Sequence, residues 1–228
     1  MMMIVRLFPK EDKEKLWQCV LPVLKNLKSE HFRPLYMSQW EPEEFTTVML
    51  DVSNVEGLCR FFTKDLAQCD VIDRSRTLTL LCPEFYPVPK TRPEKLHRFR
   101  IAIQVDTRHL ETVFNKMSDI NYTAVKCFPT YRALSFGEDD ILLSILAESE
   151  ECINNLIQEQ IIPLEGVINA EYIRITKSYR IIPKDEWVAY RKKLYQVKHE
   201  GDLNEMDEEF DWSLESMAGM TGAFLDEL

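Results

Sequence analysis

The 228 residues carry a formal net charge of −10, but this charge is unevenly distributed along the chain. Residues 200–228 hold ten acidic and no basic side chains, so residues 1–199 are balanced, with 28 of each sign. A balanced body lacks the broad basic face that neutralises phosphates, which argues against direct DNA binding. No window is apolar enough for a membrane span and no signal peptide is recognisable, so we expect a cytoplasmic protein.

The cysteines and histidines show no pattern typical of a metal or redox site. The six cysteines form no C-x-x-C pair, and most lie in apolar strand or helix patterns, so we expect them to be reduced and structural. The four histidines have no metal-ligand spacing with acids or cysteines. No phosphate-binding loop or nucleophile motif is present. The sequence therefore predicts no metal site, no cofactor and no catalytic residue.

The first 90 residues alternate between strand and helix patterns. Ser53 and Glu56 have the spacing of a capping box and precede an apolar helical face. The patterns predict, in order, a strand at 3–8, a helix at about 10–28 kinked at Pro22, strands at 32–39 and 46–52, a helix from residue 53 and a strand at 76–85. This order is one βαββαβ unit, which we place at residues 1–90.

The same order returns after a short charged linker at residues 91–97. The patterns predict a strand at 99–105, a helix capped by Asp106 or Thr107, strands at 123–136 and 141–147, a helix capped by Ser149 and a strand at 167–176. We place this second βαββαβ unit at residues 98–182. Segments 45–90 and 140–184 differ in length by one residue, which indicates an internal repeat of about 95 residues.

Two such units predict an α+β fold of tandem ferredoxin-like repeats. Each repeat should form a four-stranded antiparallel sheet with its helices on one face. Several strands are apolar on both sides, as at Ile141, Leu142 and Leu143, so the bare faces should be buried as well. We therefore expect the two sheets to pack face to face within one chain, as a pseudo-two-fold dimer of repeats. Whether the chain also forms a homo-oligomer is left open.

The second repeat contains GEDDILLSILAES followed by IIPLEGVINAEYIRITKSYRI. This sequence resembles the effector-binding (RAM, dimeric α+β barrel) domain of the Lrp/AsnC regulators over about residues 98–182. The first repeat matches only in pattern, because residues 40–45 lack the Gly-x-x-Asp motif. The resemblance implies α+β barrels that bind amino acids near subunit interfaces. With a first strand expected at Met3, the helix-turn-helix of that family has no room before it, so we expect action through protein partners.

The turn Gly137, Glu138, Asp139 and Asp140 is the predicted site for an amino-acid-like ligand. Glycine tolerates positive φ and close ligand approach, and a carboxylate could meet the ligand's amino group. Because the first repeat lacks this turn, we expect at most one site per chain. Asp139 and Asp140 could instead be paired catalytic carboxylates or cap a hairpin turn. Adjacent residues on a strand point to opposite faces, which favours capping or ligand contact over pairing.

The C-terminal region combines an amphipathic helix with an acidic tail. Residues 183–199 predict a helix that ends in four basic residues, Arg191, Lys192, Lys193 and Lys198. The tail at 200–228 is either a solvated end or an acidic peptide that orders against a partner or against this basic surface. The second interpretation names apolar anchors in the tail, which are Phe210, Trp212, Leu214 and Phe224.

These observations favour a non-enzymatic small-molecule sensor or protein-interaction module. The alternative is an enzyme or small-cofactor binder of the dimeric α+β barrel class, which would use a cleft between sheet and helices. The interior between the sheets distinguishes the two. A dry apolar interface favours the sensor, whereas a hollow lined by Tyr131, Arg132 or His109 favours chemistry.

Overall fold

The computed structural model describes residues 1–89, 93, 95–137, 139–196 and 210–211. The first half contains β1 (Met2–Pro9), α1 (Lys13–Asn26), β2 (Phe32–Glu41), β3 (Thr46–Val52), α2 (Val55–Arg60) and β4 (Ile72–Phe85). The second half contains β6 (His97–Val105), α3 (Leu110–Lys116), β7 (Cys127–Phe136), β8 (Ile141–Ala147), α4 (Glu150–Leu156) and β9 (Val167–Arg180). The remaining elements are α5 (Lys184–Gln196) and two short strands, β5 (Val88–Pro89) and β10 (Phe210–Asp211).

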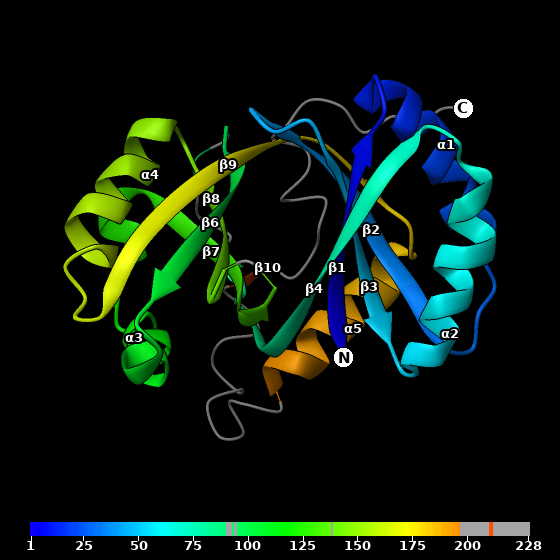
Figure 1. The fold of residues 1–228 in the computed structure, drawn as a ribbon. Helices are drawn as coiled ribbons and strands as arrows, with labels where there is room; N and C mark the ends of the chain where they lie inside the picture. The colour runs from blue at the N-terminus through cyan, green and yellow to red at the C-terminus, as the bar shows by residue number, and fades with distance from the viewer. Residues whose placement is uncertain (90–92, 94, 138, 197–209, 212–228) are drawn as a thin grey trace.

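Eight strands close into one antiparallel barrel in the order β1, β3, β2, β9, β6, β8, β7 and β4. Figure 1 shows the barrel between two helical layers, with α1 and α2 on one side and α3 and α4 on the other. Closure depends on β4 and β9, which have 14 residues each. Each pairs with a strand of its own half along one edge and with a strand of the other half along the opposite edge. The barrel strands therefore protect one another's edges.

The prediction of an α+β fold built from two ferredoxin-like halves, of the dimeric α+β barrel type, is confirmed. The halves join edge to edge, which differs from the expected face-to-face packing of two separate sheets. Either arrangement buries the sheet faces that the helices leave bare. The apolar pattern of the strands alone therefore does not distinguish between them.

Side-chain alternation explains why the strands are apolar on both sides. In β1, Met3, Val5 and Leu7 pack in an outer core with α1, whereas Met2 and Ile4 belong to the core inside the barrel. The second half has its own outer core, in which β6 and β8 pack against α3 and α4. The described residues thus form two helix-covered cores, one core enclosed by the barrel and a smaller apolar cluster around Trp40.

Two predicted local features differ in the structure. The N-cap of α2 is Asn54, whose side chain accepts from the Glu56 amide, while the Ser53 hydroxyl donates to the His31 carbonyl at 2.8 Å. The expected strand from residue 123 begins only at Cys127. Residues 122–125 form a 3₁₀ turn, which Lys126 ends with a φ of 55°. An asparagine cap precedes each helical segment, Asn54 before α2 and Asn121, which accepts from the Ala124 amide, before the 3₁₀ turn.

Helix α5 closes one end of the barrel. Its Trp187 is buried in the barrel core, and Tyr190 and Leu194 pack beside it. In Figure 1 this helix, in orange, overlaps the lower ends of β1, β3 and β4. Arg191 is completely buried, and its Nη2 donates to the Tyr86 carbonyl at 2.8 Å. The expectation that Arg191 belongs to an exposed basic surface is therefore wrong, because its guanidinium anchors the helix to the barrel.

The acidic tail is described only at β10, which pairs antiparallel with β5. Of the predicted anchors, Phe210 lies in this strand, and Trp212, Leu214 and Phe224 lie outside the described residues. Binding of a protein partner by the tail stays a prediction.

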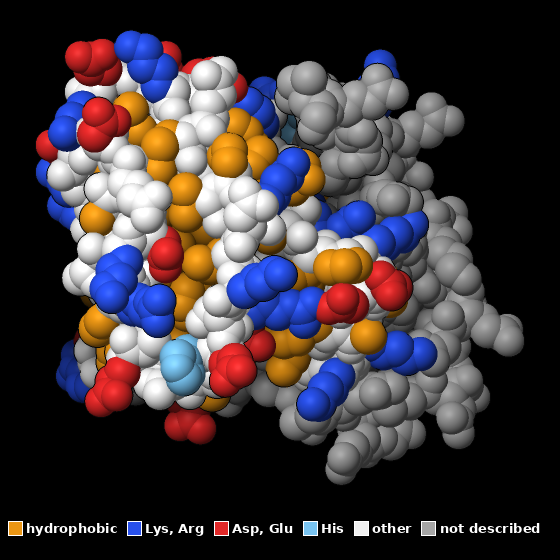
Figure 2. Space-filling model, turned by 90° about the vertical axis from the view of Figure 1, so that its right-hand side faces the viewer, with side chains coloured by type: hydrophobic (Ala, Val, Ile, Leu, Met, Phe, Trp, Pro, Cys, Tyr) orange, Lys and Arg blue, Asp and Glu red, His pale blue; other side chains and the backbone are white. Residues whose placement is uncertain are grey.

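The outer face over α1 and α2 carries charges of both signs. Figure 2 shows Lys and Arg side chains there, interspersed with Asp, Glu and hydrophobic side chains. This mixture fits the charge balance of residues 1–199. Within the described part of the chain, no helix is long and apolar enough to cross a membrane.

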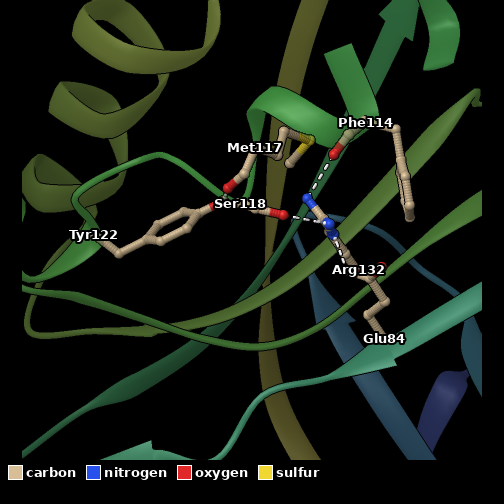
Figure 3. A network of polar contacts seen from close by, with 6 residues as sticks. All are labelled: Glu84, Phe114, Met117, Ser118, Tyr122 and Arg132. Carbon is tan, nitrogen blue, oxygen red and sulfur yellow. Dashed lines mark hydrogen bonds and ion pairs between the residues drawn. The ribbon is translucent and has the colours of Figure 1, made fainter. Parts of the chain in front are cut away.

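Arg132 ties the second helical layer to the barrel (Figure 3). It is 3% exposed, and its Nε and Nη1 donate to Glu84 Oε2 and the Phe114 carbonyl, both at 2.5 Å. Its Nη2 donates to Ser118 Oγ at 2.6 Å. All three guanidinium nitrogens thus have acceptors, which come from β4 and from the end of α3. A buried charge satisfied in this way fixes the position of α3.

We expect Arg132→Met to lower the free energy of unfolding by about 3 kcal/mol or more, because it removes the cation from a buried ion pair. Urea denaturation measures this change. Arg108→Met is the control, since Arg108 forms an exposed pair with Asp106 and its loss should leave the midpoint almost unchanged. Equal shifts for the two variants would contradict a structural role for the Arg132 network.

Candidate functional site

The barrel end opposite α5 opens into a hollow of about 480 Å³. Both halves line it. Arg6 and Phe8 come from β1, Arg100 from β6, and Asp139 from the turn between β7 and β8. In an antiparallel barrel these residues share one end because the first strands of the two halves and the two hairpin turns meet there. The hollow is of the size typical for small-molecule sites.

Asp139 and Arg6 form an ion pair at the floor of the hollow. The distance from Arg6 Nη2 to Asp139 Oδ2 is 3.4 Å, and the two side chains are 11% and 15% exposed. Burial raises the pKa of Asp139 above its usual value, although Arg6 and Arg100 oppose the shift. Burial likewise lowers the pKa of Arg6, and the repulsion of Arg100 acts in the same direction. The pair thus combines a carboxylate that is costly to ionise with a cation that orients it.

Arg100 lies beside this pair and is only 2% exposed. Its Nη2 donates to the Tyr131 hydroxyl at 3.2 Å, and its guanidinium carbon lies 4.1 Å from the centroid of the Trp40 ring. Trp40 is fixed in turn by donating to Thr47 Oγ1 at 2.9 Å, and Ser38 lies 2.6 Å from the same hydroxyl. Nε and Nη1 of Arg100 have no acceptor among the described residues.

The charges of the hollow are balanced at the rim but not at the floor. The rim carries two exposed cations and two exposed anions, which are Arg74, Arg76, Glu43 and Glu171. At the floor, Arg6 and Arg100 face one carboxylate, that of Asp139. Arg98, two residues before Arg100 on the same face of β6, adds a further buried cation, and burial lowers its pKa. The barrel interior therefore holds an excess of positive charge among the described residues.

The structure separates the residues of the predicted ligand turn. Gly137 has a φ of 142°, and a Cβ there would lie 2.7 Å from Leu78 Cδ2, so this glycine is required where β7 meets β4. Asp140 Oδ2 accepts from the Val105 amide at 2.8 Å and so caps the turn. Of the three turn residues that the structure describes, only Asp139 lines the hollow. The two carboxylates diverge, because Asp139 pairs with Arg6 and Asp140 caps the turn, and Glu138 lies outside the described residues.

Of the residues expected to line an interior hollow, only Tyr131 lies inside the barrel. Arg132 points to α3, and His109 packs against Gly166, where a Cβ would lie 2.2 Å from the His109 Cβ. Arg6 and Arg100 were not predicted. A signal for them exists in the sequence, since each places a charge at an alternating position of an otherwise apolar strand, in MMIVRLF and RFRIAI.

A second hollow of about 710 Å³ lies on the outer surface between α1 and α2. Its Lys28, Glu30, His31 and Arg60 are all exposed, so solvent screens their charges. The barrel end is the better site because its charged groups are buried and constrained. Within the described residues, no three His, Cys, Asp or Glu side chains cluster in a way that could hold a metal ion.

No protein-family model matches the chain, and no curated protein matches it. Solved structures do. An anthrone oxidase-like protein has a TM-score of 0.53 at 8% identity, covering 80% of this chain and 94% of its own. A mutant chlorite dismutase from Candidatus Nitrospira defluvii has a TM-score of 0.47 at 12% identity, covering 86% and 95%. AsnC from E. coli has a TM-score of 0.33 at 13% identity, covering 55% and 74%.

These similarities define the fold as that of the dimeric α+β barrel proteins. They do not single out the Lrp/AsnC effector domain, which was the more specific prediction. The expectation of a non-enzymatic sensor or interaction module is contradicted, because the similar structure with a TM-score above 0.5 is an anthrone oxidase-like protein. The alternative interpretation, an enzyme or small-cofactor binder of this class, is favoured. The polar, charged floor of the hollow agrees with it.

The raised pKa of Asp139 predicts a pH-dependent stability difference. A carboxyl group that binds its proton more tightly when folded stabilises the protein below the unfolded pKa of about 3.9, and this contribution is lost as pH rises through the folded pKa. Relative to wild type, Asp139→Asn should therefore become more stable as pH rises from about 4. Urea titrations at a series of pH values measure the difference.

Asp106→Asn is the control, with the opposite sign. Hydrogen bonds from Arg108 lower the pKa of Asp106, so wild type should gain stability over this variant as pH rises through the acid range. If the stability differences of both variants change with pH in the same direction, burial does not determine the pKa of Asp139.

Proposed function

We propose that this protein is an enzyme of the dimeric α+β barrel class that acts on a small organic molecule by proton transfer at the open end of the barrel. In this proposal the Asp139 carboxylate takes a proton from an acidic C–H or O–H group of the substrate. The electron pair stays on the substrate as an enolate or phenolate. Arg6 holds the carboxylate in place, and the net positive charge at the floor of the hollow favours the negative charge that develops.

The observation that carries this proposal is the position of Asp139, a largely buried carboxylate in a hollow of substrate size. A general base must lie within reach of the substrate and have a pKa close to the working pH. Burial moves the pKa of Asp139 in that direction. The similarity to an anthrone oxidase-like protein supports the enzyme class and leaves the substrate open.

We also propose that the second half is related to the effector-binding domain of the Lrp/AsnC regulators. The sequence pattern from Gly137 to Asp140 supports this relationship. Its turn would then have been retained for its geometry, with Asp139 turned to a new use. Direct ligand contact by Gly137 or Asp140 stays a prediction.

Proton abstraction can be measured without knowing the complete reaction. A panel of aryl ketones and 1,3-dicarbonyl compounds is incubated with the protein in D₂O, and loss of the acidic proton is followed by NMR, with oxygen consumption recorded in parallel. For a compound that the protein turns over, Asp139→Asn should slow the exchange by a factor of about 10² or more. Asp106→Asn, which lies outside the hollow, should exchange at the wild-type rate.

The rate should also rise with pH, since only the ionised carboxylate accepts a proton. The acid limb should lie above the usual aspartate range, because burial outweighs the attraction of Arg6 and Arg100 and the repulsion of Asp140 adds to it. Rates that are unaffected by Asp139→Asn at every pH would show that another group is the base.

A further inference from the structure

Arg100 has more hydrogen-bonding capacity than the protein uses. Its guanidinium is 2% exposed, one face lies over Trp40, and Nη2 donates to Tyr131. Nε and Nη1 have no acceptor among the described residues, although Arg100 lines the hollow. Buried polar groups in folded proteins are nearly always satisfied, so a pair of unused donors at a cavity indicates a missing acceptor.

The charge around Arg100 specifies what that acceptor is. Arg6 and Arg98 are also buried inside the barrel, and Asp139 is the one carboxylate at the floor of the described hollow. Arg6 already binds this carboxylate. Arg132 provides a contrast, because it is equally buried and its three nitrogens all have acceptors. Arg100 therefore has both unused hydrogen-bond donors and a positive charge that no carboxylate among the described residues balances.

We infer that the open end of the barrel binds a small organic anion whose carboxylate or phosphate group accepts hydrogen bonds from Nε and Nη1 of Arg100. The inference rests on the proposed function for the location of the site and adds the chemical class of the ligand. A neutral carbonyl could accept the same hydrogen bonds, but it would leave the excess positive charge uncompensated.

The walls of the hollow define the rest of the ligand. Phe8, Phe45 and Ile173 line it and belong to one apolar cluster with Trp40. Such walls suit an aryl or alkyl body, and a hollow of about 480 Å³ holds one small molecule. The Asp139 carboxylate repels the anionic group of the ligand. This repulsion directs the anionic group to Arg100 and leaves the other end of the ligand for Asp139.

The test is calorimetric titration of the full-length protein with ligands of one shape and different charge. Benzoate and phenyl phosphate carry the two anionic groups, benzamide is the neutral counterpart, and inorganic phosphate lacks the apolar body. We expect one of the two aromatic anions to bind at least about tenfold more tightly than benzamide and than inorganic phosphate. Which anion binds more tightly identifies the group as carboxylate or phosphate.

Three variants locate the binding. Arg100→Gln should lower the affinity for the preferred anion by about tenfold or more. Arg108→Gln removes the same charge from an exposed site, so it should leave this affinity unchanged. Arg100→Lys keeps the charge but loses the planar donors, so it should retain intermediate affinity and serves if Arg100→Gln does not fold. Asp139→Asn should bind the anion more tightly, although it slows proton exchange.

The opposite effects of Asp139→Asn separate the two proposals. Tight anion binding with exchange unaffected by Asp139→Asn would overturn the proposed base and leave the anion site intact. The anion site would be overturned if neither benzoate nor phenyl phosphate bound more tightly than benzamide, or if the anion affinity were unchanged in Arg100→Gln. If Arg108→Gln weakened anion binding as much as Arg100→Gln does, the anion would respond only to the net charge of the protein. That result would also overturn the anion site.

Discussion

The closure of the barrel by β4 and β9 is the constraint on which the rest of the structure depends. Each of these strands has 14 residues and pairs with both halves, so neither four-stranded sheet has its edges covered without the other half. Closure turns the sheet faces that carry no helix inward and creates an interior that side chains must fill. Apolar residues fill the end near α5. Arginines and hydroxyl groups fill the middle, and the hollow occupies the opposite end.

Two buried arginines differ in how completely their hydrogen-bond donors are satisfied. Arg132 lies on the outer side of its strand, where Glu84, Ser118 and a helix-terminal carbonyl satisfy it completely. Arg100 lies on the inner side of β6 and is satisfied in part. The first arrangement contributes rigidity. The second imposes an electrostatic cost, and such costs are tolerated in folded proteins mainly where a site uses them.

Much of this fold could be predicted from the sequence because its signals are local. The apolar run at Ile141–Ala147, the cap at Ser149 and the two βαββαβ orders all depend on neighbouring residues, and the structure confirms them. The joining of the halves could not be predicted in the same way. It depends on pairing between residues such as Tyr36 and Arg180, which are far apart in the chain. The site could be predicted only in part, for the same reason. Asp139 was named from its turn, but Arg6 and Arg100 become neighbours only when the barrel closes.

Because the barrel is built from a single chain, its two halves can differ in sequence, which the subunits of a homodimer cannot. In a symmetric dimer, every residue near the two-fold axis is present twice, so an arginine there faces its own copy and a carboxylate does the same. Here the two halves differ in sequence, and the arginine of one half lies opposite the carboxylate of the other. The two sides of the barrel end are therefore chemically different. A ligand with two unlike ends can be held in one orientation, and each position can change in evolution without a simultaneous change in its counterpart.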